Sequence, residues 1–219
     1  MKKLLAFLFA VVVGASTVAA QEDRPFYNDI RGFKIADSIQ APPQDAILFV
    51  GSSSFRMWND LQKDFPKKTV INRGFGGSSL PHVIDYANDI IFPYNAKQIV
   101  IYAGENDFAA SDTVSAQTVA NRFQQLFYLI REKQPEVPIV FISIKPSPSR
   151  AHLMRKMSEA NHLIKEFLDD QKKTEFVDVY TLMLNETGHP REDIFLEDKL
   201  HMNRKGYDIW KKALKRHLK

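Results

Sequence analysis

Short, almost wholly apolar runs recur along this chain and predict the strands of a parallel sheet. The runs cover residues 46–50, 69–71, 98–103, 139–144 and 176–179. Continuous apolar runs of this length, rich in β-branched residues, are typical of strands that are buried on both faces. A sheet whose strands are buried in this way is expected to carry helices on both sides.

Between these runs, apolar residues recur at helical spacing. The spacing predicts one helix over 114–133 and another over 153–168. A last helix is expected to begin at Asn203, which suits the N-cap position, and to run to about Leu218. Strands that alternate with helices predict an α/β sandwich with right-handed crossovers.

The first twenty residues have the layout of a secretory signal peptide. Lys2 and Lys3 precede an apolar run over 4–13, and small residues up to Ala20 fit a cleavage site. A membrane anchor is the alternative, but residues 4–20 fall slightly short of the roughly 20 that span a bilayer core. We therefore predict cleavage after Ala20, no stable membrane span afterwards, and a periplasmic or secreted protein.

The rest of the chain is expected to form a lead-in and one domain. Residues 21–43 are polar and end in two prolines, and residues 44–219 are long enough to bury a core without staples. The chain contains no cysteine, which excludes disulfides and thiolate catalysis. The formal charge of +4 falls to +2 without the first two lysines, which is too small to predict a nucleic-acid partner.

Polar and glycine-rich segments follow three of the predicted strands. They cover residues 51–54, 72–79 and 104–107. Each segment alone is a weak signal, because connecting loops often have this composition. Ligands in open parallel sheets bind beyond the carboxyl ends of the strands, so these segments are expected to contribute to one site.

A fourth segment, just ahead of the last helix, carries a carboxylate and an imidazole. Asp198 precedes His201 by three residues and can reach its ring Nδ1 within one turn of chain. That contact would fix the tautomer and leave Nε2 free to act as a base. For the other histidines, surface or packing roles are expected.

Ser53 is the candidate nucleophile. It follows a buried strand and Gly51, where the chain is expected to turn from sheet to helix. A serine hydroxyl needs a neighbouring base to take its proton. The resulting oxyanion needs donors, and the N–H of Ser53, a backbone N–H near Gly77 and the amide of Asn106 are candidates.

These four segments, in this order, resemble the sequence blocks of the SGNH (GDSL) hydrolase superfamily. The resemblance runs from the first predicted strand to the C-terminus. It implies that Ser53 is the nucleophile and first oxyanion donor, with Gly77 and Asn106 as the second and third donors. It also implies that His201 is the general base and that Asp198 orients it. The fold implied is a three-layer α/β/α sandwich with a five-stranded parallel sheet of flavodoxin-like order, and no cofactor or metal is used.

The resemblance leaves two points of register open. The family usually has aspartate where this chain has Ser52, and that aspartate is not a triad member, so hydrolysis should survive its replacement. Ser52 and Ser54 remain alternative nucleophiles within the run of three serines. Gly74 and Gly76 remain alternatives to Gly77 as the second donor.

Aromatic and basic side chains near these segments have two interpretations each. Phe55, Trp58, Phe75 and Phe108 flank the motif positions, and they either wall a shallow apolar pocket for a short acyl chain or belong to the core. The segment 145–150 carries Lys145 and Arg150, which with nearby arginines form either a basic rim for an anionic substrate or solvated loop charge.

Together these features predict an exported serine esterase that hydrolyses carboxylic esters through an acyl-Ser53 intermediate. Its expected substrates are short-chain acyl or acetyl esters of lipids or carbohydrates. One alternative is a non-catalytic binding module that keeps the fold without the activity. Another is a metal-dependent phosphoesterase with Asp198, His201 and Asp107 as ligands, although no further histidine has suitable spacing.

Overall fold

The computed structural model describes residues 24–219, so the predicted signal segment and its cleavage site lie outside the described residues. The chain divides into one unit that ends at Ala41 and a second that covers Pro42–Lys219. Within the first unit, helix α2 spans Tyr27–Ile39. The range expected as a polar lead-in therefore contains a helix of 13 residues.

The second unit is built on a five-stranded sheet in which every pairing is parallel. Its strands are β1 (Ile47–Gly51), β2 (Val70–Gly74), β3 (Gln98–Tyr102), β4 (Ile139–Ile142) and β5 (Thr174–Val177). They are arranged in the order β2-β1-β3-β4-β5. This is the flavodoxin-like order, so the predicted fold class is confirmed.

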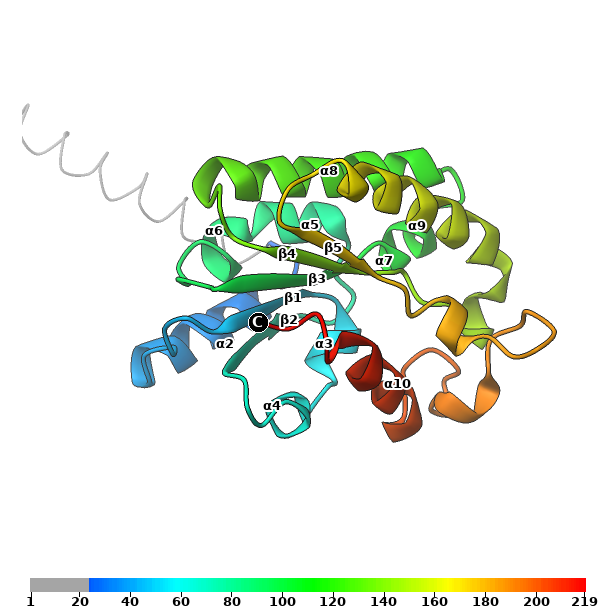
Figure 1. Ribbon diagram of the computed structural model, residues 1–219, viewed down its shortest axis with the longest axis horizontal. Helices are drawn as coiled ribbons and strands as arrows, with labels where there is room; N and C mark the ends of the chain where they lie inside the picture. The colour runs from blue at the N-terminus through cyan, green and yellow to red at the C-terminus, as the bar shows by residue number, and fades with distance from the viewer. Residues whose placement is uncertain (1–23) are drawn as a thin grey trace, which may run out of the picture. The chain divides into compact units, whose positions relative to one another are not determined.

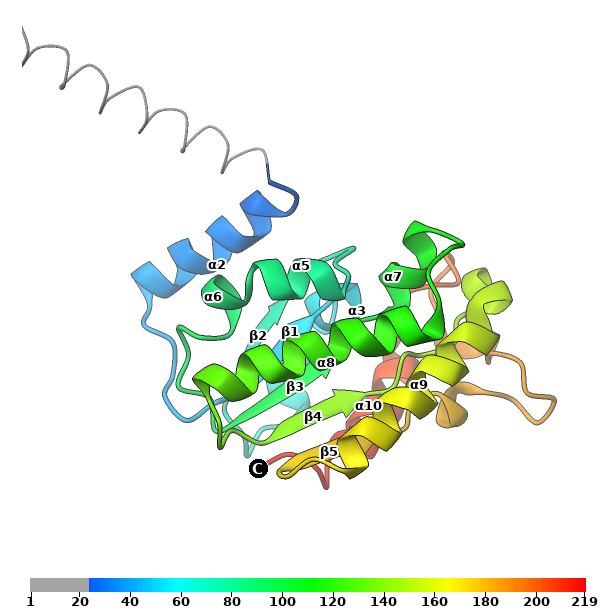
Figure 2. The same ribbon diagram turned by 90° about the horizontal axis from the view of Figure 1, so that it is seen from above.

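Helices cover both faces of this sheet, as Figure 1 shows and the view of Figure 2 supports. The helices of the second unit are α3 (Ser53–Arg56), α4 (Leu61–Asp64), α5 (Leu80–Asp85), α6 (Ala87–Ile90), α7 (Glu105–Ala110), α8 (Ala116–Lys133), α9 (Met154–Asp169) and α10 (Arg204–Leu214), with short 3-10 turns η1 (Pro148–Leu153), η2 (Thr181–Met183) and η3 (Glu192–Ile194). Helices α5, α8 and α9 lie on one face, and α3, α4 and α10 lie on the other (Figure 1).

The strand register brings the ends of three strands level with one another. Gly51, the last residue of β1, pairs with Gly74 of β2 and with Tyr102 of β3. The segments that follow these strands therefore leave the sheet at the same edge. This edge is where the sequence places its candidate chemistry.

The last helix begins where the sequence predicts and ends earlier. The side chain of Asn203 accepts hydrogen bonds from the N–H groups of Lys205 and Gly206, which caps α10. After Leu214 the chain is tied to the start of β3, where the side chain of Gln98 bonds the carbonyl of His217 at 2.7 Å. This side-chain contact competes with continued helix, and the expected end at Leu218 is not reached.

Candidate active site

The serine and the histidine proposed from the sequence meet at the carboxyl edge of the sheet. The Oγ of Ser53 lies 3.1 Å from the Nε2 of His201, although the two residues are 148 positions apart in the chain. The Nδ1 of the same ring lies 2.6 Å from the Oδ2 of Asp198. An ionised carboxylate only accepts hydrogen bonds, so Nδ1 carries the proton and Nε2 is free to accept one from Ser53.

The segment that carries Asp198 and His201 is a tight turn organised by the carboxylate itself. The Oδ1 of Asp198 accepts hydrogen bonds from the backbone N–H groups of Leu200 and His201, each at 2.9 Å. Lys199, which lies between Asp198 and Leu200, adopts a left-handed backbone with φ of 54°. Burial of Asp198 opposes ionisation, but these hydrogen bonds outweigh it and lower its pKa to about 2. The carboxylate is therefore charged at neutral pH and able to orient the imidazole.

Ser53 takes its position from the sharp turn between β1 and α3. Gly51 has φ of 143°, and a Cβ at this position would lie 1.8 Å from the carbonyl oxygen of Tyr102. Only glycine tolerates both conditions, so this sharp turn requires glycine at position 51. Ser53 is the first residue of α3 and is partly exposed, whereas Ser52 and Ser54 are 97% buried, with 3% exposure each.

The candidate oxyanion donors come from three segments that are tied together. The side-chain amide of Asn106 donates to the carbonyl of Ser78 at 2.9 Å. The hydroxyl of Ser78 in turn donates to the carbonyl of Gly51 at 3.1 Å. Within residues 24–219, the backbone N–H groups of Ser53 and Gly77 donate to no acceptor, so both are available to a ligand. The amide of Asn106 has a second N–H that remains available as well.

The four aromatic residues considered as pocket walls lie in the core. Phe55 and Phe75 are fully buried, and Trp58 and Phe108 are 2% and 1% exposed. Phe55 and Trp58 pack edge-on against Trp210 of α10. A side chain with so little exposed surface cannot line an open acyl pocket, so this expectation is wrong and the core interpretation is correct.

A buried charged cluster next to the site was not expected from the sequence. The carboxylate of Glu105 accepts a hydrogen bond from the hydroxyl of Tyr102 at 2.8 Å and pairs with Lys145 at 3.0 Å and Arg150 at 3.2 Å. Lys145 has a side chain only 1% exposed, so it does not contribute to a basic rim. The signal available in the sequence was Glu105 itself, a carboxylate directly before Asn106 at a strand end.

The third residue of the alternative metal site is engaged elsewhere. The carboxylate of Asp107 accepts hydrogen bonds from the N–H of Leu80 at 2.9 Å and from Arg122 at 2.8 Å. Among the described residues, no group of three or more histidines and carboxylates is arranged to hold a metal ion.

In the same part of the chain, no helix has both the length and the apolar character to cross a membrane.

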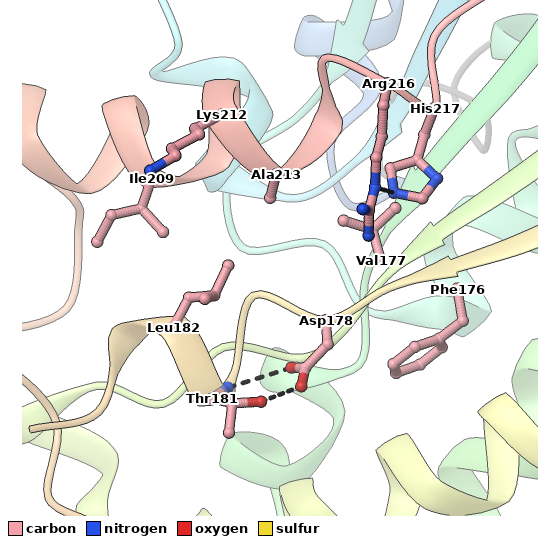
Figure 3. A pocket seen from close by; sticks show the side chains of 10 residues that line it. All are labelled: Phe176, Val177, Asp178, Thr181, Leu182, Ile209, Lys212, Ala213, Arg216 and His217. Atoms are coloured by element: carbon pink, nitrogen blue, oxygen red, sulfur yellow. Dashed lines mark hydrogen bonds between the residues drawn. The ribbon is translucent and has the colours of Figure 1, made fainter. Parts of the chain in front are cut away.

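A separate hollow lies between β5 and α10. Its volume is about 570 Å³, and Figure 3 shows Leu182 and Ile209 facing one another across it, with Arg216 and His217 at one end. Asp178 in its floor is bonded to the N–H of Thr181 at 3.1 Å. The lining residues include none of those in the serine–histidine–aspartate chain, so this hollow is distinct from the candidate site.

Residues 37–209 match the model of the GDSL-like lipase/acylhydrolase family. Over 182 residues the chain is 25% identical to platelet-activating factor acetylhydrolase IB subunit alpha1 from Bos taurus, which covers 79% of this chain and 74% of that protein.

Two solved structures extend the comparison to the fold. A GDSL-like lipase from Bacteroides thetaiotaomicron matches with a TM-score of 0.74 and 18% identity, covering 86% of this chain and 96% of that one. An acetyl xylan esterase from Geobacillus stearothermophilus matches with a TM-score of 0.64 and 16% identity, covering 80% and 94%. At these identities the structural matches show the fold alone.

Proposed function

The chain belongs to the GDSL-like lipase/acylhydrolase family, and from this premise we propose that it hydrolyses carboxylic esters through an acyl intermediate on Ser53. The observation that supports the proposal most directly is the continuous hydrogen-bonded chain from Asp198 through His201 to Ser53. A serine hydroxyl within reach of an oriented imidazole is the arrangement that nucleophilic catalysis requires.

The first half of the proposed reaction forms the acyl-enzyme. The Oγ of Ser53 attacks the ester carbonyl while the Nε2 of His201 takes the hydroxyl proton. The carbonyl oxygen becomes an oxyanion that accepts hydrogen bonds from the N–H groups of Ser53 and Gly77 and from the amide of Asn106. The C–O bond to the alcohol then breaks, and the imidazolium returns its proton to the departing alkoxide.

The second half uses the same groups on water. Nε2 of His201 removes a proton from a water molecule, whose oxygen attacks the acyl carbon. The second tetrahedral intermediate collapses by breaking the bond to the Oγ of Ser53, which regains its proton from the imidazolium. The products are one alcohol and one carboxylic acid, and Asp198 stabilises the imidazolium at both stages without losing or gaining a proton.

For the substrate we propose an ester of a short acyl group, with acetyl as the first choice. The four aromatic side chains that flank the motif positions are packed in the core, so none of these four is available as a wall for a long acyl chain. Two of the matched proteins are named for acetyl groups: the sequence relative is an acetylhydrolase subunit, and the structural neighbour is an acetyl xylan esterase. We further propose that the protein is exported, on the basis of the sequence of its first twenty residues.

A substrate series tests this function against the alternative of a non-catalytic binding module. Purified protein is assayed with p-nitrophenyl esters from acetate to octanoate, with acetylated xylooligosaccharides and with an acetylated glycerophospholipid. Ser53→Ala should abolish most turnover of every ester that the wild type hydrolyses, while Ser158→Ala, which alters an exposed serine on α9, should not. Equal rates for wild type and Ser53→Ala would favour the binding module.

A further inference from the structure

Lys145 connects the buried cluster to the segment that holds the general base. Its Nζ donates to the carbonyl of Leu200 at 2.9 Å, between Asp198 and His201 in the chain. The same ammonium group lies 3.0 Å from the Oε2 of Glu105. Because an ammonium group is compact and here almost fully buried, it fixes the distance between the catalytic turn and the start of α7.

Arg150 connects the same cluster to an oxyanion donor. Its Nη1 lies 3.1 Å from the Oδ1 of Asn106 and 3.2 Å from the Oε1 of Glu105. A guanidinium group only donates hydrogen bonds, so the oxygen of the Asn106 amide must face Arg150. The carbonyl of Ser78 only accepts, so the nitrogen of the same amide must face Ser78. The Asn106 amide is thus held in one orientation by two independent contacts.

Glu105 is the common partner of the two cations. Its side chain is only 6% exposed, and burial alone would oppose its charge. The positive charges of Lys145 and Arg150 and the hydroxyl of Tyr102 outweigh that penalty and lower the pKa of Glu105. A buried charge that lost these partners would be costly, so the cluster resists rearrangement.

We propose that Glu105, Lys145 and Arg150 form a positioning unit that sets the place of the general base relative to the oxyanion hole. Lys145 acts through Leu200 on His201, and Arg150 acts through the amide of Asn106. None of the three is needed to contact the substrate, and the inference rests on the proposed ester hydrolysis at Ser53. A misplacement of reacting groups by about 1 Å can cost about 100-fold in rate, so the unit should act mainly on kcat.

Double-mutant cycles test the two routes separately. Arg150→Met should lower kcat for p-nitrophenyl acetate about 10- to 100-fold with little change in KM, and it should have almost no further effect when Asn106 is already alanine. Lys145→Met should lower kcat in both backgrounds to the same extent, because it acts on His201 instead. Lys165→Met is the control, since Lys165 makes an exposed ion pair with Asp169 on α9; it should leave kcat unchanged.

The outcomes separate the positioning unit from the proposed function. If Arg150→Met costs the same factor with and without Asn106, or if both substitutions change only the melting temperature, the positioning unit is refuted. Should Lys145→Met fail to fold, the double variant Glu105→Gln with Lys145→Met removes both charges of that pair, and an unchanged kcat in the folded double variant would also refute the positioning unit. Turnover retained by Ser53→Ala would overturn the proposed function and the positioning unit together. An inactive Ser53→Ala, combined with an Arg150→Met effect that is additive with that of Asn106→Ala, would overturn the positioning unit alone.

Discussion

The reactivity proposed for Ser53 depends on a few hydrogen bonds around one imidazole. The carboxylate of Asp198 accepts from Nδ1 of His201 and from two backbone N–H groups of its own turn. These bonds keep the carboxylate charged and hold the ring so that Nε2 faces the serine hydroxyl. The proposed base is therefore oriented before any substrate binds, which is a form of electrostatic preorganisation that lowers a reaction barrier.

Asn106 gives a prediction at this scale. Asn106→Ala should lower kcat by about 10²–10³-fold, because one donor to the developing oxyanion is lost. KM should change little, since the contact strengthens mainly in the transition state. The control is Asn121→Ala, which removes an amide on the exposed face of α8. Steady-state kinetics that moved KM alone would indicate that the amide only binds substrate.

At the scale of elements, α10 is held against α4 by a buried carboxylate. Asp64 accepts hydrogen bonds from Arg204 at 2.6 and 2.8 Å and from the indole of Trp58 at 2.8 Å, and it also pairs with Lys211. Burial opposes the charge of Asp64, but these partners lower its pKa to about 2 from an ordinary value of 3.8. Since α10 directly follows the turn that carries Asp198 and His201, this cluster also restrains the position of that turn.

The shifted pKa of Asp64 predicts how stability depends on pH. The pKa of Asp64 is lower in the folded than in the unfolded protein. Its contribution to the stability of the fold is therefore present above about pH 4 and is lost as the pH falls toward about 2. In urea unfolding, the free energy of unfolding should therefore be lower for Asp64→Asn than for wild type near neutral pH, and this difference should become smaller in acid. Asp169→Asn, which alters an exposed pair on α9, should show little difference at either pH. A difference for Asp64→Asn that stayed constant with pH would contradict the role given to this carboxylate.

The strands and long helices were predictable because their apolar periodicity is strong. The residues after β1 and β3 were predictable as site candidates because parallel strands present their carboxyl ends at one edge. The short helices α3, α4, α6 and α7 span only one or two turns and carry too few residues for a period to be visible. Their boundaries follow from tertiary contacts that no local window contains.

Side-chain partners far apart in sequence were the part that could not be predicted. Glu105 and Lys145 are 40 positions apart, and Lys145 alone looked like solvated charge on a proline-rich loop. Phe75 and Phe108 sit beside motif residues, and adjacency in sequence does not say whether a ring faces the site or the core. In both cases the burial and the partners of the side chain depend on which helix covers which face of the sheet.

At the scale of the whole molecule, the chain divides into a first segment and a second unit that holds the proposed active site. The family match begins at residue 37 and the compact second unit begins at Pro42. The proposed active site combines residues from distant parts of this unit, since Ser53 follows its first strand and His201 precedes its last helix.

Export predicts the mass of the protein isolated from its natural compartment. Cleavage after Ala20 should leave a chain that begins at Gln21, and intact mass spectrometry of protein from the periplasm or medium should find it. A variant with Ala20→Pro, which blocks a cleavage site of small residues, should accumulate uncut. Full-length protein found only inside the cell would contradict the export proposal.

The acyl-enzyme is the species whose detection tests the central claim most directly. Brief acid quenching during turnover of p-nitrophenyl acetate, or labelling with a fluorophosphonate, should add one acyl or phosphonyl group to the peptide that contains residues 52–54. Fragmentation should place that group on Ser53, and His201→Ala should slow its formation by several orders of magnitude. A group found on Ser52 or Ser54, or continued ester hydrolysis by Ser53→Ala with no covalent species, would contradict this account.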